Sequence, residues 1–559
     1  MARIGVYICE CGSNIKDKVN IPRVMEALAD MEDVVVVEPY RLLCSPDGKK
    51  YLEDRIRTER LTHVVIAACS PRDHQQTFMN VCESAGLNPY MMQLVNIREQ
   101  CAWVTEDPES ATEKATRMIR SAVRRVRYQV PLSKRDLAIN PDVLVLGGGV
   151  AGIEACLTLA SMGRKVYLVE KGPKLGGMIS LFRNILPDQA GHAVLDDKIS
   201  GLTKDRNVEV LTDHELVNLV GYTGNFVATV RAATGQAAER SLAVGALIVA
   251  TGAQLFNPNG TMGIEAAPSE DVLTPLEFEA MARSGVVVRA NGSVPRSACV
   301  IHCVGREAKE YCSKVCCSYG LKFSRYLKEM VQDIQIHHLY SDLCIPGIKQ
   351  QEFCEETARL GVTLVRSSQV SMRKGKTGPH IDFVDEGGAG RSLDVELVIL
   401  LTALEPRDDA GQLAELLGIG QEKEGFFSRK HEKLAQMASD REGVFLAGSA
   451  EGPKGIAESV VQAQAASGAV LASLVPGRRM EVEAKTSHIS ETLCQGCGTC
   501  VAVCPFGAIT LDANRKIAIV NEVMCRGCGN CVAACPSGAA SVKHFTYDQI
   551  YQEIAEATR

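Results

Sequence analysis

Val143-Leu-Val-Leu-Gly-Gly-Gly-Val-Ala-Gly152 is the stretch that decides the fold of this 559-residue chain. Its first four residues form an apolar run that predicts a buried strand, and Ile153–Met162 predict a helix. Between them Gly147, Gly149 and Gly152 have the spacing G-x-G-x-x-G, which permits a tight turn, close approach of a pyrophosphate and close helix–strand packing. The N-terminus of the helix then faces the phosphate charge. The stretch therefore predicts a dinucleotide-binding α/β domain.

A second strand is expected at Arg164–Val169, and Glu170 follows it where a carboxylate can bond a ribose hydroxyl. Leu175-Gly-Gly177, Ala250-Thr-Gly252 and the late turn Ala447-Gly448 resemble the FAD domain of two-dinucleotide-binding flavoproteins such as thioredoxin reductase. The resemblance implies FAD rather than NAD, with the late turn beside the flavin. The expected FAD contacts are Gly147, Gly149, Gly152, Glu170, Lys171, Gly176, Gly177, Ala250, Thr251, Gly252 and Gly448.

Two copies of one cysteine run, C-x2-C-x2-C-x3-C-P, occupy residues 494–505 and 525–536. In this bacterial ferredoxin pattern three cysteines bind one [4Fe–4S] cube and the fourth binds the other cube. Disulfides or two zinc knuckles are the alternatives, but a zinc site needs four ligands of its own and has no use for crossed sharing. One cluster is expected on Cys494, Cys497, Cys500 and Cys535, and the other on Cys525, Cys528, Cys531 and Cys504.

A third cysteine group stands where related disulfide reductases carry a second glycine turn for NAD(P)H. The strand expected at Cys299–Cys303 is followed by Val304-Gly-Arg306, without a G-x-G-x-x-G sequence. A redox-active dithiol of Cys312 and Cys316 is one alternative, and ordinary buried cysteines, like the unassigned Cys344, are another. Four thiols that include an adjacent pair cannot easily all be disulfide partners, and iron accepts four thiolates. The group predicts a third [4Fe–4S] cluster on Cys303, Cys312, Cys316 and Cys317.

This group also carries a family resemblance. Cys303-Val-Gly, followed by Tyr311-Cys-Ser-Lys-Val-Cys-Cys317, resembles the cluster motif of the HdrA family, the flavin subunit of heterodisulfide reductases. The resemblance covers essentially the whole chain, and its other carriers are Gly5–Asn14, Ala68–Arg72, Asn96–Trp103 and Glu451–Lys454. Longer members contain an additional ferredoxin insert after the first FAD segment. Residues 185–245 of this chain contain no cysteine, so the two clusters of that insert are not expected here.

The resemblance implies a further cluster in the N-terminal domain. Five cysteines match the motif positions, namely Cys9, Cys11, Cys44, Cys69 and Cys101. Three of them, Cys9, Cys44 and Cys69, fall just after predicted strands, at one edge of a parallel sheet where they can converge. On the hypothesis that Cys9 points into the sheet, the expected ligands are Cys11, Cys44, Cys69 and Cys101. The alternative is a domain core with reduced thiols.

Two lysines are candidates for a catalytic role. Lys322 follows the adjacent cysteines, and Lys454 lies in the late turn. A cation near the N1–C2=O edge of the flavin, or one bonded at N5, would stabilise the reduced ring electrostatically. The alternative for each is an ordinary solvated lysine.

The organisation predicted for the chain is an α/β fold with a thioredoxin-reductase-like FAD-binding Rossmann core. A small N-terminal α/β domain covers residues 1–130, because short β-branched runs alternate there with amphipathic segments. The FAD domain covers 140–478, with the cluster motif at 303–317. A ferredoxin domain with two [4Fe–4S] clusters covers 484–545, and a tail covers 546–559.

Composition excludes several classes of protein. The net charge of −6 does not indicate a nucleic-acid partner. No apolar stretch reaches the roughly 18 residues needed to span a bilayer, so no transmembrane segment is expected. The start of the chain lacks the features of a signal peptide. With thiolates expected on metal, we expect a cytoplasmic protein in a reducing compartment.

The function predicted from these parts is an oxidoreductase in which FAD exchanges electrons in pairs or singly and four clusters pass them one at a time. The resemblance implies electron bifurcation within a heterodisulfide reductase (HdrABC-type) complex, toward ferredoxin and a partner reductase. It also implies that electrons enter from a hydrogenase or dehydrogenase, and that the flavin subunit can form a homodimer. One rival is an NAD(P)H-dependent disulfide or ferredoxin oxidoreductase that uses Cys312 and Cys316. The other is a non-catalytic electron-relay or scaffold subunit.

Overall fold

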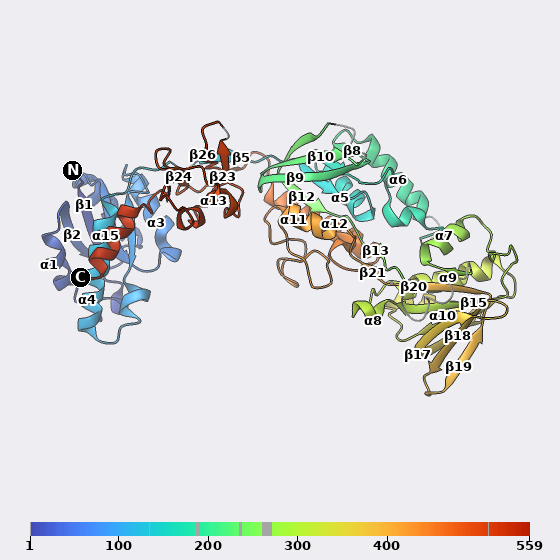
Figure 1. Ribbon diagram of the computed structural model, residues 1–559. Coiled ribbons are helices and arrows are strands. Elements are labelled where there is room, and N and C mark those ends of the chain that lie inside the picture. Colours follow the sequence, from blue (N-terminus) through green and yellow to red (C-terminus); the bar gives the residue numbers. More distant parts are fainter. Residues whose placement is uncertain (1, 134, 186–190, 234–237, 260–270, 513) are drawn as a thin grey trace. The chain divides into compact units, whose positions relative to one another are not determined.

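The computed structural model describes residues 2–133, 135–185, 191–233, 238–259, 271–512 and 514–559 (Figure 1). The chain forms two compact units. One consists of residues 138–479, and the other joins residues 1–137 to residues 480–559. Within the described residues, no helix has both the length and the apolar character required to cross a membrane.

The N-terminal unit is built on a parallel sheet with the strand order β2–β1–β3–β4. Its strands are β1 (Ile4–Cys9), β2 (Val34–Tyr40), β3 (His63–Ala68) and β4 (Met92–Asn96). Its helices are α1 (Ile21–Ala29), α2 (Pro46–Thr58), α3 (Pro71–Ser84) and α4 (Pro108–Val126). Each helix begins with a proline in its first turn after an Asn, Ser or Asp whose side chain accepts a backbone N–H.

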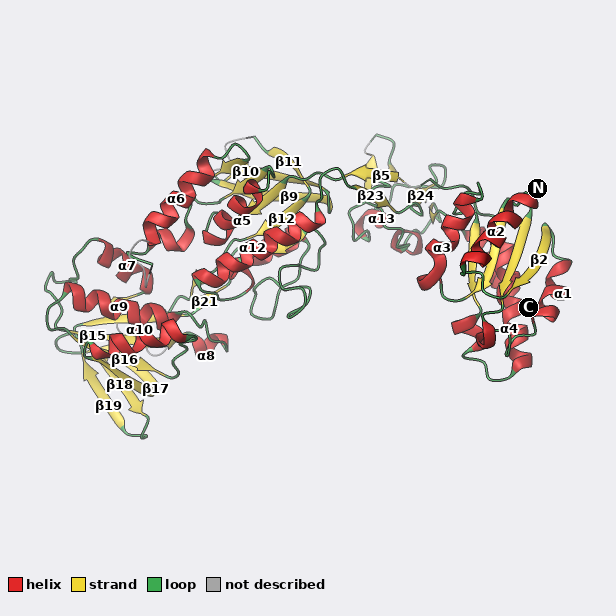
Figure 2. Ribbon diagram, turned by 180° about the vertical axis from the view of Figure 1, so that it is seen from behind, coloured by secondary structure: helices red, strands yellow, loops and turns green. Residues whose placement is uncertain are grey.

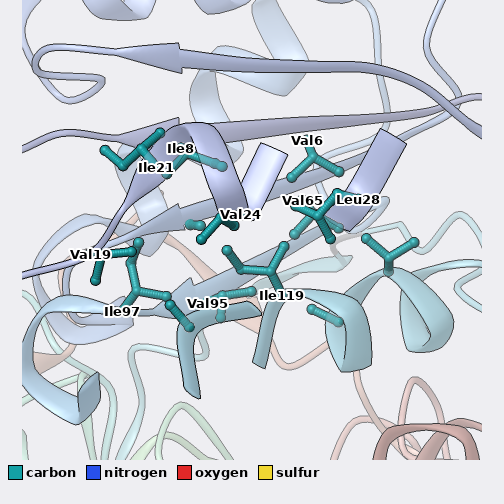
Figure 3. Close-up of a cluster of buried hydrophobic side chains, with 14 of the residues drawn as sticks. Val6, Ile8, Val19, Ile21, Val24, Leu28, Val65, Val95, Ile97 and Ile119 are labelled. Atoms are coloured by element: carbon teal, nitrogen blue, oxygen red, sulfur yellow. The ribbon is translucent and has the colours of Figure 1, made fainter. Parts of the chain in front are cut away.

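The two faces of this sheet have separate cores, because alternate residues of a strand point to opposite sides. Val6 and Ile8 of β1 pack with α1 and α4, including Val24, Leu28 and Ile119 (Figure 3). The other face packs against α2 and α3 and contains the neighbouring β1 residues. Figure 2 shows these helices around the strands. The arrangement confirms the predicted small parallel α/β layer.

The chain returns to this unit through β23 (Arg479–Val482), which pairs with β5 (Arg135–Ala138). Two short antiparallel pairs follow, β24 (Ser487–Ile489) with β27 (Ala540–Val542), and β25 (Ile509–Asp512) with β26 (Ile517–Val520). The helices α13 (Thr499–Ala502) and α14 (Asn530–Ala533) each contain the third cysteine of a run.

The residues expected to form a tail are an integral helix, α15 (Tyr547–Ala557), in contact with α4. The carboxylate of Glu556 is almost fully buried and pairs with Arg120 and Arg124, and Glu553 pairs with Arg125. The basic stretch of α4 is thus neutralised within the chain. The sequence pattern predicted a helix here but not its docking site.

The second unit contains two sheets joined by the short pair β13 (Gln254–Leu255) and β21 (Leu404–Glu405). The first sheet is parallel, with the order β22–β12–β6–β7–β8. Its strands are β6 (Val143–Leu146), β7 (Val166–Val169), β8 (Val208–Leu211), β12 (Ala246–Val249) and β22 (Val444–Leu446). The helices α5 (Val150–Ser161), α6 (Gly191–Lys204) and α12 (Ile456–Ser473) share a core with one face.

The opposite face is covered by the antiparallel strands β9 (His214–Tyr222), β10 (Asn225–Ala232) and β11 (Arg240–Val244), with α11 (Ala410–Leu417). Both faces are therefore buried. This explains why the strands of this sheet are continuous apolar runs rather than alternating ones.

The second sheet has the order β14–β20–β15–β16–β17–β18–β19. Its strands are β14 (Val272–Leu273), β15 (Ser297–Val304), β16 (Gln335–Tyr340), β17 (Val362–Lys374), β18 (Pro379–Asp385), β19 (Gly390–Asp394) and β20 (Leu397–Thr402). The helices are α7 (Pro275–Arg283), α8 (Arg306–Lys309), α9 (Cys316–Met330) and α10 (Ile348–Arg359). The group at 303–317 lies where β15 ends and α9 begins.

Candidate functional site

The glycine turn between β6 and α5 has three glycines with two different roles. Gly147 has a φ of +103°, and a Cβ there would overlap the carbonyl of Ala250. A Cβ on Gly152 would overlap the carbonyl oxygen of Gly147. Gly149 differs, because its φ is −76° and a Cβ would meet no atom within 4 Å. The first and third glycines are needed by the fold, and the second keeps a space open at the helix N-terminus.

Neighbouring loops close around this turn. The Glu170 carboxylate accepts the backbone N–H groups of Gly148 and Gly172, each at 2.6 Å. The N–H of Gly176 donates to the Gly148 carbonyl at 2.8 Å, and Gly177 lies so close that its Cβ would be 3.0 Å from the Gly149 Cα. The predicted Leu175-Gly-Gly177 loop therefore contacts the turn directly.

The remaining predicted FAD contacts occupy more varied positions. Ala250 donates its N–H to Leu146 at 2.7 Å and continues into Thr251 and Gly252 at the end of β12. Lys171 instead forms ion pairs with Asp409 and Glu215, and its side chain is half exposed. The structure thus places Lys171 in a surface ion network rather than on the glycine turn.

The late turn lies against the N-terminus of α5. Gly448 is buried with a φ of +70°, and its N–H donates to Gln462 Oε1 at 2.8 Å. A Cβ on Gly448 would be 2.9 Å from the Cβ of Ala151. The glycine turn, Leu175–Gly177, β12 and the late turn therefore meet at one edge of the sheet. The open space at Gly149 and the N–H groups of a helix N-terminus fit the pyrophosphate of FAD.

Each candidate lysine is paired with a buried carboxylate. Lys322 on α9 is almost fully buried, pairs with Glu279 of α7, and has its Nζ 4.4 Å from the Phe182 ring centroid. Burial lowers the pKa of the Lys322 ammonium, against the opposite effect of Glu279. Lys454 pairs with Glu451, whose carboxylate also lies 3.2 Å from Arg429.

The third cysteine group is held at the carboxyl edge of the seven-stranded sheet. Cys303 has a φ of +59°, and its sulfur lies 3.9 Å from the carbonyl oxygen of Asp342, as does that of Cys317. Cys316 and Cys317 begin α9 and are both buried, whereas Cys312 is exposed. A hydrogen bond from Cys316 is the main cause that lowers the pKa of the Cys317 thiol, so Cys317 deprotonates first.

Cys344 joins this group, although sequence reasoning left it without a role. Its backbone N–H donates to Cys317 Sγ at 3.4 Å, and its thiol is hydrogen-bonded to that of Cys312. It lies shortly after β16, next to β15, so it reaches the sheet edge at which Cys303 also lies. The signal that could have found Cys344 is this position after a parallel strand.

In the N-terminal unit, four cysteines occur together and the fifth does not. Cys9 and Cys69 belong to the core that faces α2 and α3, and Cys11 and Cys44 pack against it. Arg98 lies 3.8 Å from Cys11 Sγ. Burial raises the pKa of the Cys69 thiol to about 11, with Arg98 opposing the shift.

Cys101 lies in the core on the opposite side of the sheet, and its thiol donates to the Ala111 carbonyl at 3.2 Å. These positions favour Cys9 over Cys101, which reverses the choice made from the sequence. The physical reason is the pleat of the sheet. Cys9 points to the same face as Cys69, and the turn after β4 directs Cys101 toward α4.

The ferredoxin runs surround two separate spaces. One, of about 320 Å³, is lined by Cys494, Cys497, Cys500 and Cys535. The other, of about 310 Å³, is lined by Cys504, Cys525, Cys528 and Cys531. Each space therefore takes three sulfurs from one run and one from the other. Within the described residues, no three His, Cys, Asp or Glu side chains are arranged to hold a single metal ion.

Comparison with known proteins bears on both modules. A 4Fe-4S dicluster domain model matches residues 493–539, and a pyridine nucleotide-disulphide oxidoreductase model matches residues 141–275. The HdrA protein of the ferredoxin/F(420)H(2)-dependent CoB-CoM heterodisulfide reductase of Methanosarcina acetivorans is 34% identical over 92% of this chain and 76% of its own length. The chain belongs to the HdrA family of heterodisulfide reductases.

Two further members of the family are similar over most of this chain. The second of two iron-sulfur HdrA proteins of the CoB–CoM heterodisulfide reductase in Methanopyrus kandleri is 33% identical over 100% of this chain and 99% of its own length. The HdrA protein of the H(2):CoB-CoM heterodisulfide,ferredoxin reductase of Methanothermobacter thermautotrophicus is 31% identical, covering 92% of both chains. Family membership confirms an oxidoreductase that combines FAD with [4Fe–4S] clusters.

The glycine turn gives the first prediction. Replacing Gly149 by Val will abolish FAD binding while the protein still folds, because the added side chain meets no protein atom but fills the space reserved for the pyrophosphate. Flavin absorbance per chain measures the loss, and the EPR signals of the ferredoxin module report that the fold persists. Gly201→Val on α6 is the matched control, since a Cβ there also meets no atom and no ligand is expected. Stoichiometric FAD in Gly149→Val would contradict the assignment.

Proposed function

We propose that this chain is the flavin subunit of a heterodisulfide-reductase-type complex, in which electron pairs are split or merged at FAD. FAD exchanges electrons in pairs or singly, and each [4Fe–4S] cluster carries one electron. The observation that carries the proposal is the content of unit 138–479. The unit combines the dinucleotide turn at 147–152 with a cysteine group at the end of β15, where a nicotinamide-binding relative has a second glycine turn.

The protein groups at the flavin turn bind and orient the dinucleotide. The N-terminus of α5 and the open position at Gly149 receive the pyrophosphate, and Glu170 stands at the end of β7 for the ribose. The Lys454–Glu451–Arg429 group at the late turn has one carboxylate and two cations. Its net positive charge supports negative charge that develops on a nearby ring.

We further propose four clusters. Two occupy the ferredoxin spaces, and one is held by Cys303, Cys312, Cys316 and Cys317, with Cys344 beside them. The fourth is held in the N-terminal unit by Cys9, Cys11, Cys44 and Cys69. Amide N–H groups and Arg98 support negative charge on these sulfurs.

Ferredoxin is the proposed low-potential partner, and a reductase subunit is the proposed high-potential one. In this scheme two electrons arrive at FAD from an electron-input partner, and one leaves along each branch. The names of the Methanosarcina and Methanothermobacter relatives include ferredoxin, which supports this choice. A homodimer of the flavin subunit remains a prediction.

Splitting requires the flavin to hold its first added electron less tightly than its second. We therefore expect the first one-electron potential of the flavin to lie below the second. A redox titration of the purified protein, followed by visible absorbance and EPR, measures both potentials. The reverse order would favour the rival in which the chain is only an electron relay.

The cluster at β15 gives a second test of function. Cys316→Ser will lower iron by about four atoms per chain and interrupt electron flow between flavin and partner, while FAD remains bound. If Cys312 and Cys316 instead form a dithiol used with NAD(P)H, iron will be unchanged. In that case NADH or NADPH will also rapidly bleach the flavin of the unaltered protein. Cys354→Ser, another buried cysteine in this unit, is the control.

The N-terminal cluster is tested by a matched pair of variants. Cys9→Ser will lose about four irons per chain, and Cys101→Ser will lose none, because only Cys9 shares a sheet face with Cys69. Iron analysis and EPR of both variants provide the measurement, against about sixteen irons expected in the unaltered protein with four cubes. Iron loss in Cys101→Ser alone would restore the ligand set predicted from the sequence, and loss in neither would exclude this cluster.

A further inference from the structure

The two ferredoxin runs repeat each other, and the repeat extends to the strand before each run. Ser487 precedes the first run and Ala518 occupies the matching position before the second. The backbone contacts of the two positions are equivalent. Ser487 donates its N–H to Cys525 Sγ at 3.2 Å, and Ala518 donates its N–H to Cys494 Sγ at 3.4 Å. Each strand thus serves the first cysteine of one run.

The side chains break this symmetry. Ser487 is only 2% exposed, and its hydroxyl oxygen lies 3.2 Å from Cys531 Sγ and 3.1 Å from the Ser541 carbonyl oxygen. Ser487 also lines the space that Cys504, Cys525, Cys528 and Cys531 surround. Ala518 lines the other space and has only a methyl group to offer there.

The direction of the hydrogen bond follows from the chemistry of the ligand. A cysteine that binds iron is a thiolate without a proton, so the Ser487 hydroxyl must donate, sharing its proton between Cys531 Sγ and the Ser541 carbonyl. Reduction of a cluster adds one negative charge, part of which resides on the sulfurs. A hydrogen bond to sulfur is therefore stronger in the reduced state and raises the reduction potential.

Other hydroxyls near the runs contact the other cluster. Thr499 Oγ1 lies 3.4 Å from Cys497 Sγ, and Ser537 Oγ lies 3.6 Å from Cys535 Sγ. Cys497 is exposed, so water competes with Thr499 there. Ser487 is the buried one of the three hydroxyls, and its hydrogen bond is shielded from solvent.

We infer that Ser487 sets the reduction potential of the cluster bound by Cys504, Cys525, Cys528 and Cys531, through its hydroxyl group on Cys531. Ser487 is a positioning and tuning residue, since it acts on the cluster through a ligand. The inference rests on the crossed ligand sets of the proposed function and does not depend on pair splitting at the flavin.

The test uses Ser487→Ala in the full-length protein with an EPR-monitored redox titration. One ferredoxin cluster will shift to a more negative midpoint potential, while the other cluster and the iron content stay unchanged. Ala518→Ser is the matched variant, because it adds a hydroxyl at the equivalent position. It will shift the cluster of Cys494, Cys497, Cys500 and Cys535 to a more positive potential and leave the other in place.

The two signals are assigned with Cys528→Ser and Cys497→Ser, each of which alters the EPR spectrum of one cluster only. If a single one of these changes perturbs both spectra by loss of iron, the crossed ligand sets of the proposed function fail. With the assignment established, an unchanged potential in Ser487→Ala overturns the inference. A shift of the other cluster, or loss of iron in Ser487→Ala, overturns it equally, since either result gives Ser487 a different role.

Discussion

The close contact of backbone with backbone at 147–152 is the constraint on which the flavin unit depends. Gly152 touches the Gly147 carbonyl, and Gly147 in turn touches Ala250 at the end of β12. These contacts fix α5 against the sheet, and the N-terminus of α5 then contacts Gly448 of the late turn. Segments far apart in the sequence are thereby brought to one edge, because no side chain separates them.

The same edge rule operates in the other α/β layers. In a parallel sheet all carboxyl ends lie together, so residues that follow different strands become neighbours. Cys9, Cys44 and Cys69 meet in this way in the N-terminal unit, and Cys303 and Cys344 meet in the seven-stranded sheet. Clusters and dinucleotide thus use one topological device in layers with different cores.

Local patterns made much of this predictable from the sequence. The glycine spacing, the acid after the second strand and the ferredoxin spacing each depend on a few consecutive residues. The choice between Cys9 and Cys101 was not accessible, because it depends on which face of the sheet a side chain takes and on the turn after β4. Cys344 and the docking of α15 likewise depend on packing between distant segments, such as Glu556 with Arg120.

The two candidate lysines can now be separated by charge. Lys322 and Glu279 form a buried one-to-one pair with no net charge, and the contact of Lys322 with Phe182 and Tyr326 makes the pair part of the packing between α7 and α9. Such a pair provides little long-range support for negative charge on another group.

Glu451 is different, because both Lys454 and Arg429 surround a carboxylate that is itself almost fully buried. One positive charge remains after the pairing, and the low exposure of the carboxylate holds both cations in place. The group lies in the turn that also contains Gly448, against the first turn of α5. An electron added to a dinucleotide ring at this edge therefore encounters a fixed positive field that is built into the fold. On this electrostatic ground Lys454 is the stronger of the two candidates, and Lys322 belongs to the structural framework that holds the cysteine helix.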